Sequence, residues 1–76
     1  MNFGKWLERA RSKSGLRQQD LADELGVHFA TVSNWEAGRR TPAYQDVVRL
    51  ARACGAPEDD ARRAAGYEPL EKIAAR

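Results

Sequence analysis

The sequence has little of what disulfides, metal sites and membrane spans require. Its 76 residues include one cysteine and one histidine, and no long apolar run. A lone cysteine excludes an internal disulfide, and neither Cys54 nor His28 belongs to a metal-ligand spacing. We therefore expect no metal, no cofactor and no small-molecule ligand. Without a secretion signal or a membrane segment, the expected compartment is the cytoplasm.

A strong excess of charge is also missing. Thirteen basic residues face eleven acidic ones, a formal net charge of +2, which is weak evidence for nucleic acid. The distribution says more, because residues 1–55 carry nine basic and six acidic groups while residues 56–76 carry four and five. The first part of the chain therefore holds the cations that phosphate contacts would need.

The sequence contains no recognisable set of catalytic residues. His28 and Cys54 stand twenty-six positions apart and suggest neither a nucleophile with its base nor a metal site. Cys54 lies in a helical apolar pattern and is interpreted as a small core residue. We do not expect an enzyme.

The centre of the sequence is a stretch, residues 17–36, that predicts two helices hinged on one glycine. The first segment has Leu21, Ala22 and Leu25 at helical spacing and ends at Gly26, which can close a helix in the left-handed conformation. Apolar spacing resumes at Val27, Val32 and Trp35. Two short helices joined by a tight turn form a helix-turn-helix, whose second helix can enter a DNA major groove.

The flanking residues predict an all-α bundle of about five helices. A helix over 3–13 is expected between Asn2 and Gly15, another over 43–54 up to Gly55, and a fifth with Pro57 in its first turn and Gly66 as its stop. Residues 1–66 form the domain and 67–76 a tail. Leu70 and Ile73 give that tail a short apolar face, which could dock on its own domain or on a second copy.

One charge falls on an inner face. Arg11 follows the apolar positions Leu7 and Ala10, and an unpaired buried guanidinium would cost several kcal/mol. Glu36, at the end of the second helix of the pair, is the expected partner. The alternative is that Arg11 reaches solvent along its long stem.

The pattern across residues 7–55 resembles the Cro/C1-type (XRE) helix-turn-helix family of bacterial and phage repressors. The matching residues are Leu7, Arg11, Gly15-Leu16, Gln18, Leu21-Ala22, Leu25-Gly26-Val27, Thr31-Val32-Ser33, Trp35-Glu36, Gly38, Pro42 and Leu50-Ala51. The resemblance implies a lambda-repressor-like domain in which residues 18–25 form the positioning helix and residues 28–36 form the recognition helix. It also implies that Arg11 and Glu36 form a structural ion pair. Two positions depart from the family: His28 replaces a capping serine or threonine, and Phe29-Ala30 is an apolar leading edge.

The interpretation is sequence-specific binding of double-stranded DNA, by a transcriptional repressor acting as a dimer on half-sites ~34 Å apart. An A·T-containing half-site is expected, because Phe29 and Ala30 suit thymine methyl groups and Asn34 suits adenine. The alternative is a protein-interaction module on the same fold, such as an antitoxin or adaptor. Asp20, Asp23 and Glu24 are expected to face away from DNA. Base contacts are predicted for Phe29, Ala30, Ser33 and Asn34, and phosphate contacts for Arg17, Gln18, His28, Thr31, Arg39 and Arg40.

Overall fold

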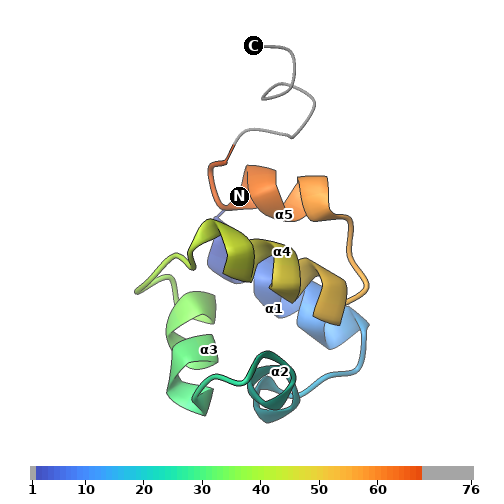
Figure 1. The fold of residues 1–76 in the computed structure, drawn as a ribbon, viewed down its shortest axis with the longest axis vertical. Coiled ribbons are helices and arrows are strands. Elements are labelled where there is room, and N and C mark those ends of the chain that lie inside the picture. The colour runs from blue at the N-terminus through green and yellow to red at the C-terminus, as the bar shows by residue number, and fades with distance from the viewer. Residues whose placement is uncertain (1, 68–76) are drawn as a thin grey trace.

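The computed structural model describes residues 2–67, which form five α-helices joined by short links (Figure 1). No strand occurs within that range. The predicted all-α bundle of about five helices is confirmed. The helices are α1 (Phe3–Lys13), α2 (Gln18–Leu25), α3 (Phe29–Glu36), α4 (Tyr44–Ala53) and α5 (Glu58–Ala64).

The helix ends follow from local residues. Asn2 caps α1, since its Oδ1 accepts the backbone N–H of Lys5 at 2.9 Å. The limits predicted for the first two helices, 3–13 and 18–25, are confirmed. The position of Pro57 was predicted wrongly: it is the N-cap of α5, in extended backbone, and three acids fill the first helical turn behind it. Those acids complement the positive end of the helix dipole.

Packing places α2 and α3 at one end of the molecule and α5 at the other, with α1 and α4 between them (Figure 1). α1 contacts both α3 and α5, and α4 contacts both α2 and α5. Among residues 2–67, no helix has the length and hydropathy that a membrane crossing requires. The core consists of twelve buried side chains: Phe3, Leu7, Leu21, Ala22, Leu25, Val32, Trp35, Val47, Leu50, Ala51, Cys54 and Ala61.

Gly4 sets the distance between α1 and α3. A Cβ atom at this position would clash with the backbone carbonyl of Glu36 and lie 2.8 Å from that of Trp35. Only glycine lets the start of α1 come this close to the end of α3. The close approach fixes where the C-terminal turn of α3 lies.

Arg62, on α5, connects that helix to α4. It is a buried arginine, with only 4% of its surface exposed. Its Nε donates to the Tyr44 hydroxyl at 2.8 Å, and its other nitrogens donate to Asp59 and Glu58. Tyr67, which the sequence placed in the tail, packs edge-on against Tyr44, and its hydroxyl donates to the Pro42 carbonyl at 3.3 Å. The predicted short helix of the tail, with Leu70 and Ile73, lies outside the described residues.

Candidate nucleic-acid interface

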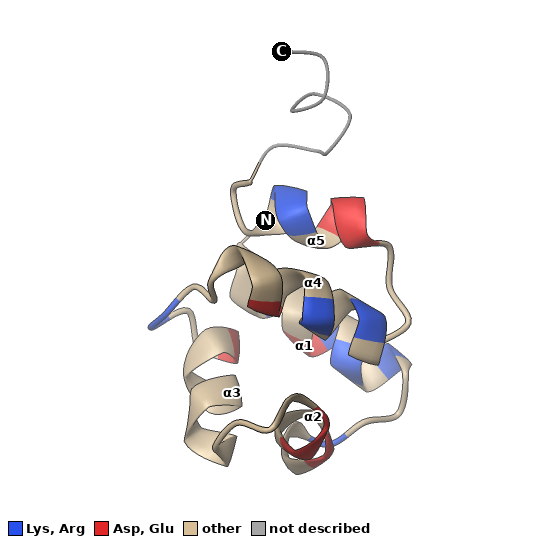
Figure 2. Cartoon of the chain, viewed as in Figure 1, with Lys and Arg blue, Asp and Glu red and all other residues tan. Residues whose placement is uncertain are grey.

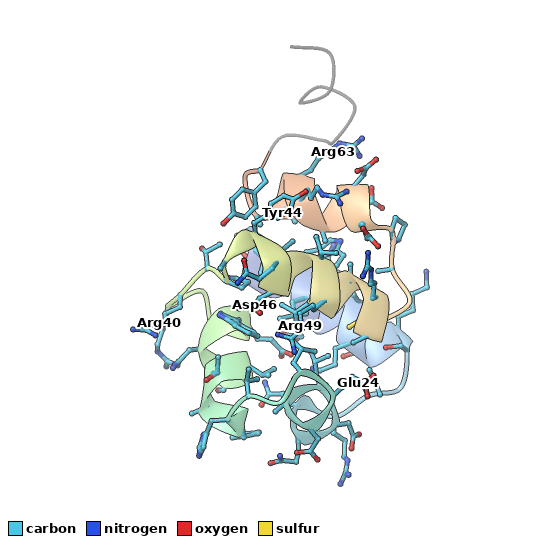
Figure 3. The ribbon with its side chains drawn as sticks, in the orientation of Figure 1. Glu24, Arg40, Tyr44, Asp46, Arg49 and Arg63 are labelled. Atoms are coloured by element: carbon cyan, nitrogen blue, oxygen red, sulfur yellow. The ribbon has the colours of Figure 1, made fainter. Side chains whose placement is uncertain are left out.

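The turn between α2 and α3 takes three residues. Gly26 ends α2 with φ +69°, and the following N–H, that of Val27, donates to the Ala22 carbonyl at 3.0 Å. From α4, Arg49 donates to the Leu25 carbonyl at the last turn of α2, and Figure 3 shows its side chain between the two helices. The turn is therefore held both by its own backbone and by a side chain of the core scaffold.

α3 has one face in the core and one in solvent. Val32 and Trp35 are buried, as predicted. On the opposite side, Phe29 is 43% exposed and Ala30 is exposed. The three polar side chains expected beside them are half-buried: Thr31, Ser33 and Asn34. The side chains at the start of the helix are therefore the most accessible ones on this face.

His28 replaces the usual capping hydroxyl without loss of the cap. It stands at the N-cap of α3 in extended backbone, and its Nδ1 accepts the backbone N–H of Ala30 at 3.1 Å. A side-chain acceptor at this position satisfies one of the free N–H groups that every helix start leaves. The unusual residue is thus the structural start of α3.

The predicted ion pair between Arg11 and Glu36 is confirmed. Arg11 Nε lies 2.5 Å from Oε2 and Nη2 lies 3.1 Å from Oε1, a two-pronged contact. The side chains are 16% and 5% exposed. The hydrogen bonds that Arg11 donates to Glu36 raise the pKa of the Arg11 guanidinium, against the opposing effect of burial. A third nitrogen donates to the Leu16 carbonyl at 2.9 Å, so the pair also holds the link before α2.

Glu36 has a second partner that the sequence did not reveal. Gln18 Nε2 donates to its Oε1 at 3.0 Å. Because a carboxylate only accepts, the amide of Gln18 must turn its nitrogen toward Glu36. Gln18 was predicted as a phosphate contact, and in the free chain one of its N–H groups is already used within the domain. The other remains for an outside acceptor.

Arg17, another predicted phosphate contact, is also paired. Its guanidinium donates to Asp20 at 2.8 and 3.1 Å, and its backbone N–H donates to the same carboxylate at 2.9 Å. These hydrogen bonds hold the pKa of Asp20 at about 2. That Asp20 faces away from DNA stays a prediction; within the domain its carboxylate lies against Arg17. Its side chain turns back to accept the backbone N–H of Arg17, the N-cap residue, as an acid at the third helical position does in a capping box.

The loop after α3 carries the remaining cations. Arg39 and Arg40 are exposed, and Figure 2 shows their blue segment at the tip of the loop, beside the almost uncharged α3. Arg40 projects away from the body of the domain (Figure 3). Arg39 turns back to α3, where Nη1 donates to Oδ1 of Asn34 at 3.4 Å. A predicted phosphate contact and a predicted base contact therefore touch each other.

A separate hollow lies on another part of the molecule. It has a volume of about 530 Å³ and is bounded by α1 and by the link between α4 and α5, with Trp6, Arg9 and Lys13 among its lining residues. None of the lining residues belongs to α2, α3 or the loop after α3. Within residues 2–67, no cluster of His, Cys, Asp and Glu could hold a metal ion. Burial raises the pKa of the Cys54 thiol, which suits a core residue.

Comparison with known proteins places the chain among helix-turn-helix domains. Residues 2–65 match the family described as "Helix-turn-helix domain". "Multiprotein-bridging factor 1" of Debaryomyces hansenii is 38% identical over 55 residues, which are 72% of this chain and 37% of that protein. An "Uncharacterized HTH-type transcriptional regulator" of Archaeoglobus fulgidus is 35% identical over 71 residues, 93% of this chain and 29% of that protein. The chain thus spans about a third of the length of these relatives.

Proposed function

Because the chain belongs to the helix-turn-helix family, in its XRE-like form, we propose that it binds double-stranded DNA sequence-specifically through α3 in the major groove. In this proposal it acts as a transcriptional repressor and as a homodimer, without a cofactor and without catalysis. The similarity to an archaeal HTH-type transcriptional regulator supports a regulatory role.

The observation that carries the proposal is the charge of α3. The helix has one acid, Glu36, and that carboxylate is turned inward, 5% exposed and neutralised by Arg11. The outer face therefore presents no carboxylate to the phosphates of DNA, while Arg39 and Arg40 follow directly in the next loop. A helix without exposed negative charge, followed by two cations, has the electrostatics that duplex binding needs.

Each expected contact keeps its proposed role. Phe29, Ala30, Ser33 and Asn34 read base edges, and six residues contact phosphates: Arg17, Gln18, His28, Thr31, Arg39 and Arg40. At the start of α2, the Arg17 guanidinium must give up one or both of its hydrogen bonds to Asp20 in order to contact a phosphate. Such an exchange is inexpensive, because the Arg17 side chain is 80% exposed.

The dimer is proposed on geometric grounds. One recognition helix reaches only a few base pairs, and a second copy on a half-site ~34 Å away supplies the missing discrimination. Selected sites should therefore be palindromic, with that spacing.

The test is site selection from a random duplex pool, followed by binding measurements at several salt concentrations. We expect one motif, a palindrome, and an affinity that falls steeply with salt. Asn34→Ala should cost about 1–3 kcal/mol on the best site and relax base preference. Asp60→Asn, on the far helix α5, is the control and should leave the selected motif unchanged. A pool that returns no motif would refute sequence-specific binding.

A second candidate is a protein-interaction module of the antitoxin or adaptor type. The hollow beside Trp6 favours it, since it leaves the proposed DNA face free for simultaneous binding. One relative, "Multiprotein-bridging factor 1" of Debaryomyces hansenii, is named for the bridging of proteins. Weak, nonspecific DNA affinity together with capture of a protein partner would favour this candidate over the first.

A further inference from the structure

The cap of α3 dictates which nitrogen of His28 carries its proton. Nδ1 accepts the backbone N–H of Ala30 at 3.1 Å, and an imidazole nitrogen has one lone pair in the ring plane. Nδ1 therefore carries no proton while the cap is formed. In the neutral ring the proton must sit on Nε2.

We propose that His28 is a hydrogen-bond donor of fixed tautomer, whose Nε2–H contacts an acceptor atom of DNA while Nδ1 holds the start of α3. The DNA half of this proposal rests on the proposed function; the tautomer does not. A serine or threonine at the N-cap has one polar side-chain atom, and that atom is used by the cap. The imidazole of histidine has a second ring nitrogen, Nε2, which the cap does not use. His28 is exposed, so that second atom is accessible to a ligand.

Within the described residues, Nε2 of His28 has no hydrogen-bond partner that would compete with DNA. The first turn of α3 contains no acidic residue, and no hydrogen bond to Nε2 occurs within residues 2–67. The start of a helix attracts phosphate, because N–H groups and the positive end of the dipole meet there. A donor at this position suits an acceptor of DNA, either a phosphate oxygen or a purine N7.

The tautomer can be measured on the free chain. His28 is the only histidine in the sequence, so the ring signals in a two-bond ¹H–¹⁵N correlation spectrum are unambiguous. At neutral to slightly alkaline pH we expect the pattern of a ring protonated at Nε2. A ring protonated at Nδ1, or an average of both tautomers, would overturn the proposal without involving DNA.

Two variants separate the cap from the donor. His28→Ser keeps an acceptor at the N-cap and removes Nε2, whereas His28→Ala removes both. The amide of Ala30 should exchange with solvent as slowly in His28→Ser as in the parent chain, and faster in His28→Ala. DNA affinity should fall roughly tenfold in His28→Ser, a change of about 1.4 kcal/mol. Parental affinity in His28→Ser would make His28 a cap only.

Modified duplexes identify the acceptor. On the selected site, single phosphates are replaced by methylphosphonates, and single purines by 7-deazapurines, which lack N7. A modification that removes the partner of His28 should weaken the parent chain and have no further effect on His28→Ser. If either modification weakens the parent chain but not His28→Ser, the proposal is supported and the acceptor atom is identified. If neither modification does so, the proposal is refuted. If no duplex is bound at all, the DNA half falls with the proposed function, while the spectrum still decides the tautomer.

Discussion

Gln18 at the start of α2 donates to Glu36 at the end of α3, with 3.0 Å between Nε2 and Oε1. The same carboxylate accepts hydrogen bonds from two nitrogens of Arg11, on α1. One side chain therefore joins three helices, and two of these, α2 and α3, carry most of the proposed DNA contacts. The orientation of the proposed DNA face therefore depends on a carboxylate that is turned into the domain.

Glu36→Gln should destabilise the fold and weaken DNA binding together. The substitution removes the charge that pairs with Arg11, whose side chain is only 16% exposed. We expect a loss of about 2–4 kcal/mol, between the values of exposed and buried pairs, measured by urea unfolding. Gln18→Ala is the matched variant: it removes one hydrogen bond, should cost about 1 kcal/mol, and should fold normally. Equal losses in the two variants would refute the central role of the ion pair.

Gly4→Ala should be destabilising, although alanine is the better helix former by about 1 kcal/mol. The new methyl group would meet the backbone carbonyls of Trp35 and Glu36, and backbone cannot move aside as a side chain can. Overpacking of this kind costs about 1–3 kcal/mol. Ser12→Ala, at an exposed position of the same helix, should be neutral or slightly stabilising. A thermal unfolding midpoint of Gly4→Ala at or above that of the parent would contradict the close approach.

Arg62→Ala should uncouple α5 from α4. It removes a buried guanidinium that bonds Tyr44, Asp59 and Glu58 and lies over the Tyr44 ring at 5.6 Å. We expect a loss on the order of 2 kcal/mol in urea unfolding. Its neighbour supplies the control, because Arg63 pairs with Asp60 in solvent and Arg63→Ala should change stability by no more than about 0.5 kcal/mol. Similar effects of the two substitutions would show that Arg62 is no structural link.

Acid should remove the contribution of Asp20. Its pKa in the folded chain is lowered from 3.8 to about 2 by Arg17, so the folded state prefers the charged carboxylate. That preference stabilises the fold above pH 4 and is lost as the pH falls toward 2. The stability difference between the parent and Asp20→Asn should therefore shrink across this range. A difference that stays constant from pH 5 to pH 2 would contradict the Arg17–Asp20 contact.

Arg40→Ala should weaken binding to all duplexes by a similar factor and lower the slope of log affinity against log salt by about one. The reason is that Arg40 projects from the loop without an internal partner among the described residues, so it is free to meet a phosphate. Arg63→Ala, a loss of the same charge on α5, should leave the slope unchanged. A loss confined to one sequence would show instead that Arg40 reads bases.

The helix limits could be predicted because their signals are local. Apolar spacing and a following glycine mark 3–13 and the end of 18–25, Asn2 is a recognisable cap, and the start at residue 18 came from the family resemblance. The Arg11–Glu36 pair was also predictable, because a charge on an inner face requires a partner.

Other features depend on how the helices cross, and their residues give no local signal. In the sequence, Gly4 is only a residue of low helix propensity. Its role becomes clear from the backbone of α3, which lies too close for a side chain at this position. Arg62 looks like one of two solvated arginines, and only the position of Tyr44 shows which of them is buried. His28 looked like the loss of a cap because hydroxyl and amide caps are the common ones, yet its ring nitrogen supplies the same acceptor. The assignment of single residues to bases or phosphates stays a prediction.

The tight contact between α1 and the end of α3 has a consequence for genetics. If the chain occupies an operator as proposed, a selection for cells in which that operator is left empty would recover substitutions at Gly4 and Arg11, although both lie on the inner side of α1. Such alleles would mimic changes in α3, the proposed DNA-contacting helix. An operator mutation that restores contact with an altered base reader would not suppress them, whereas a second change that stabilises the bundle would.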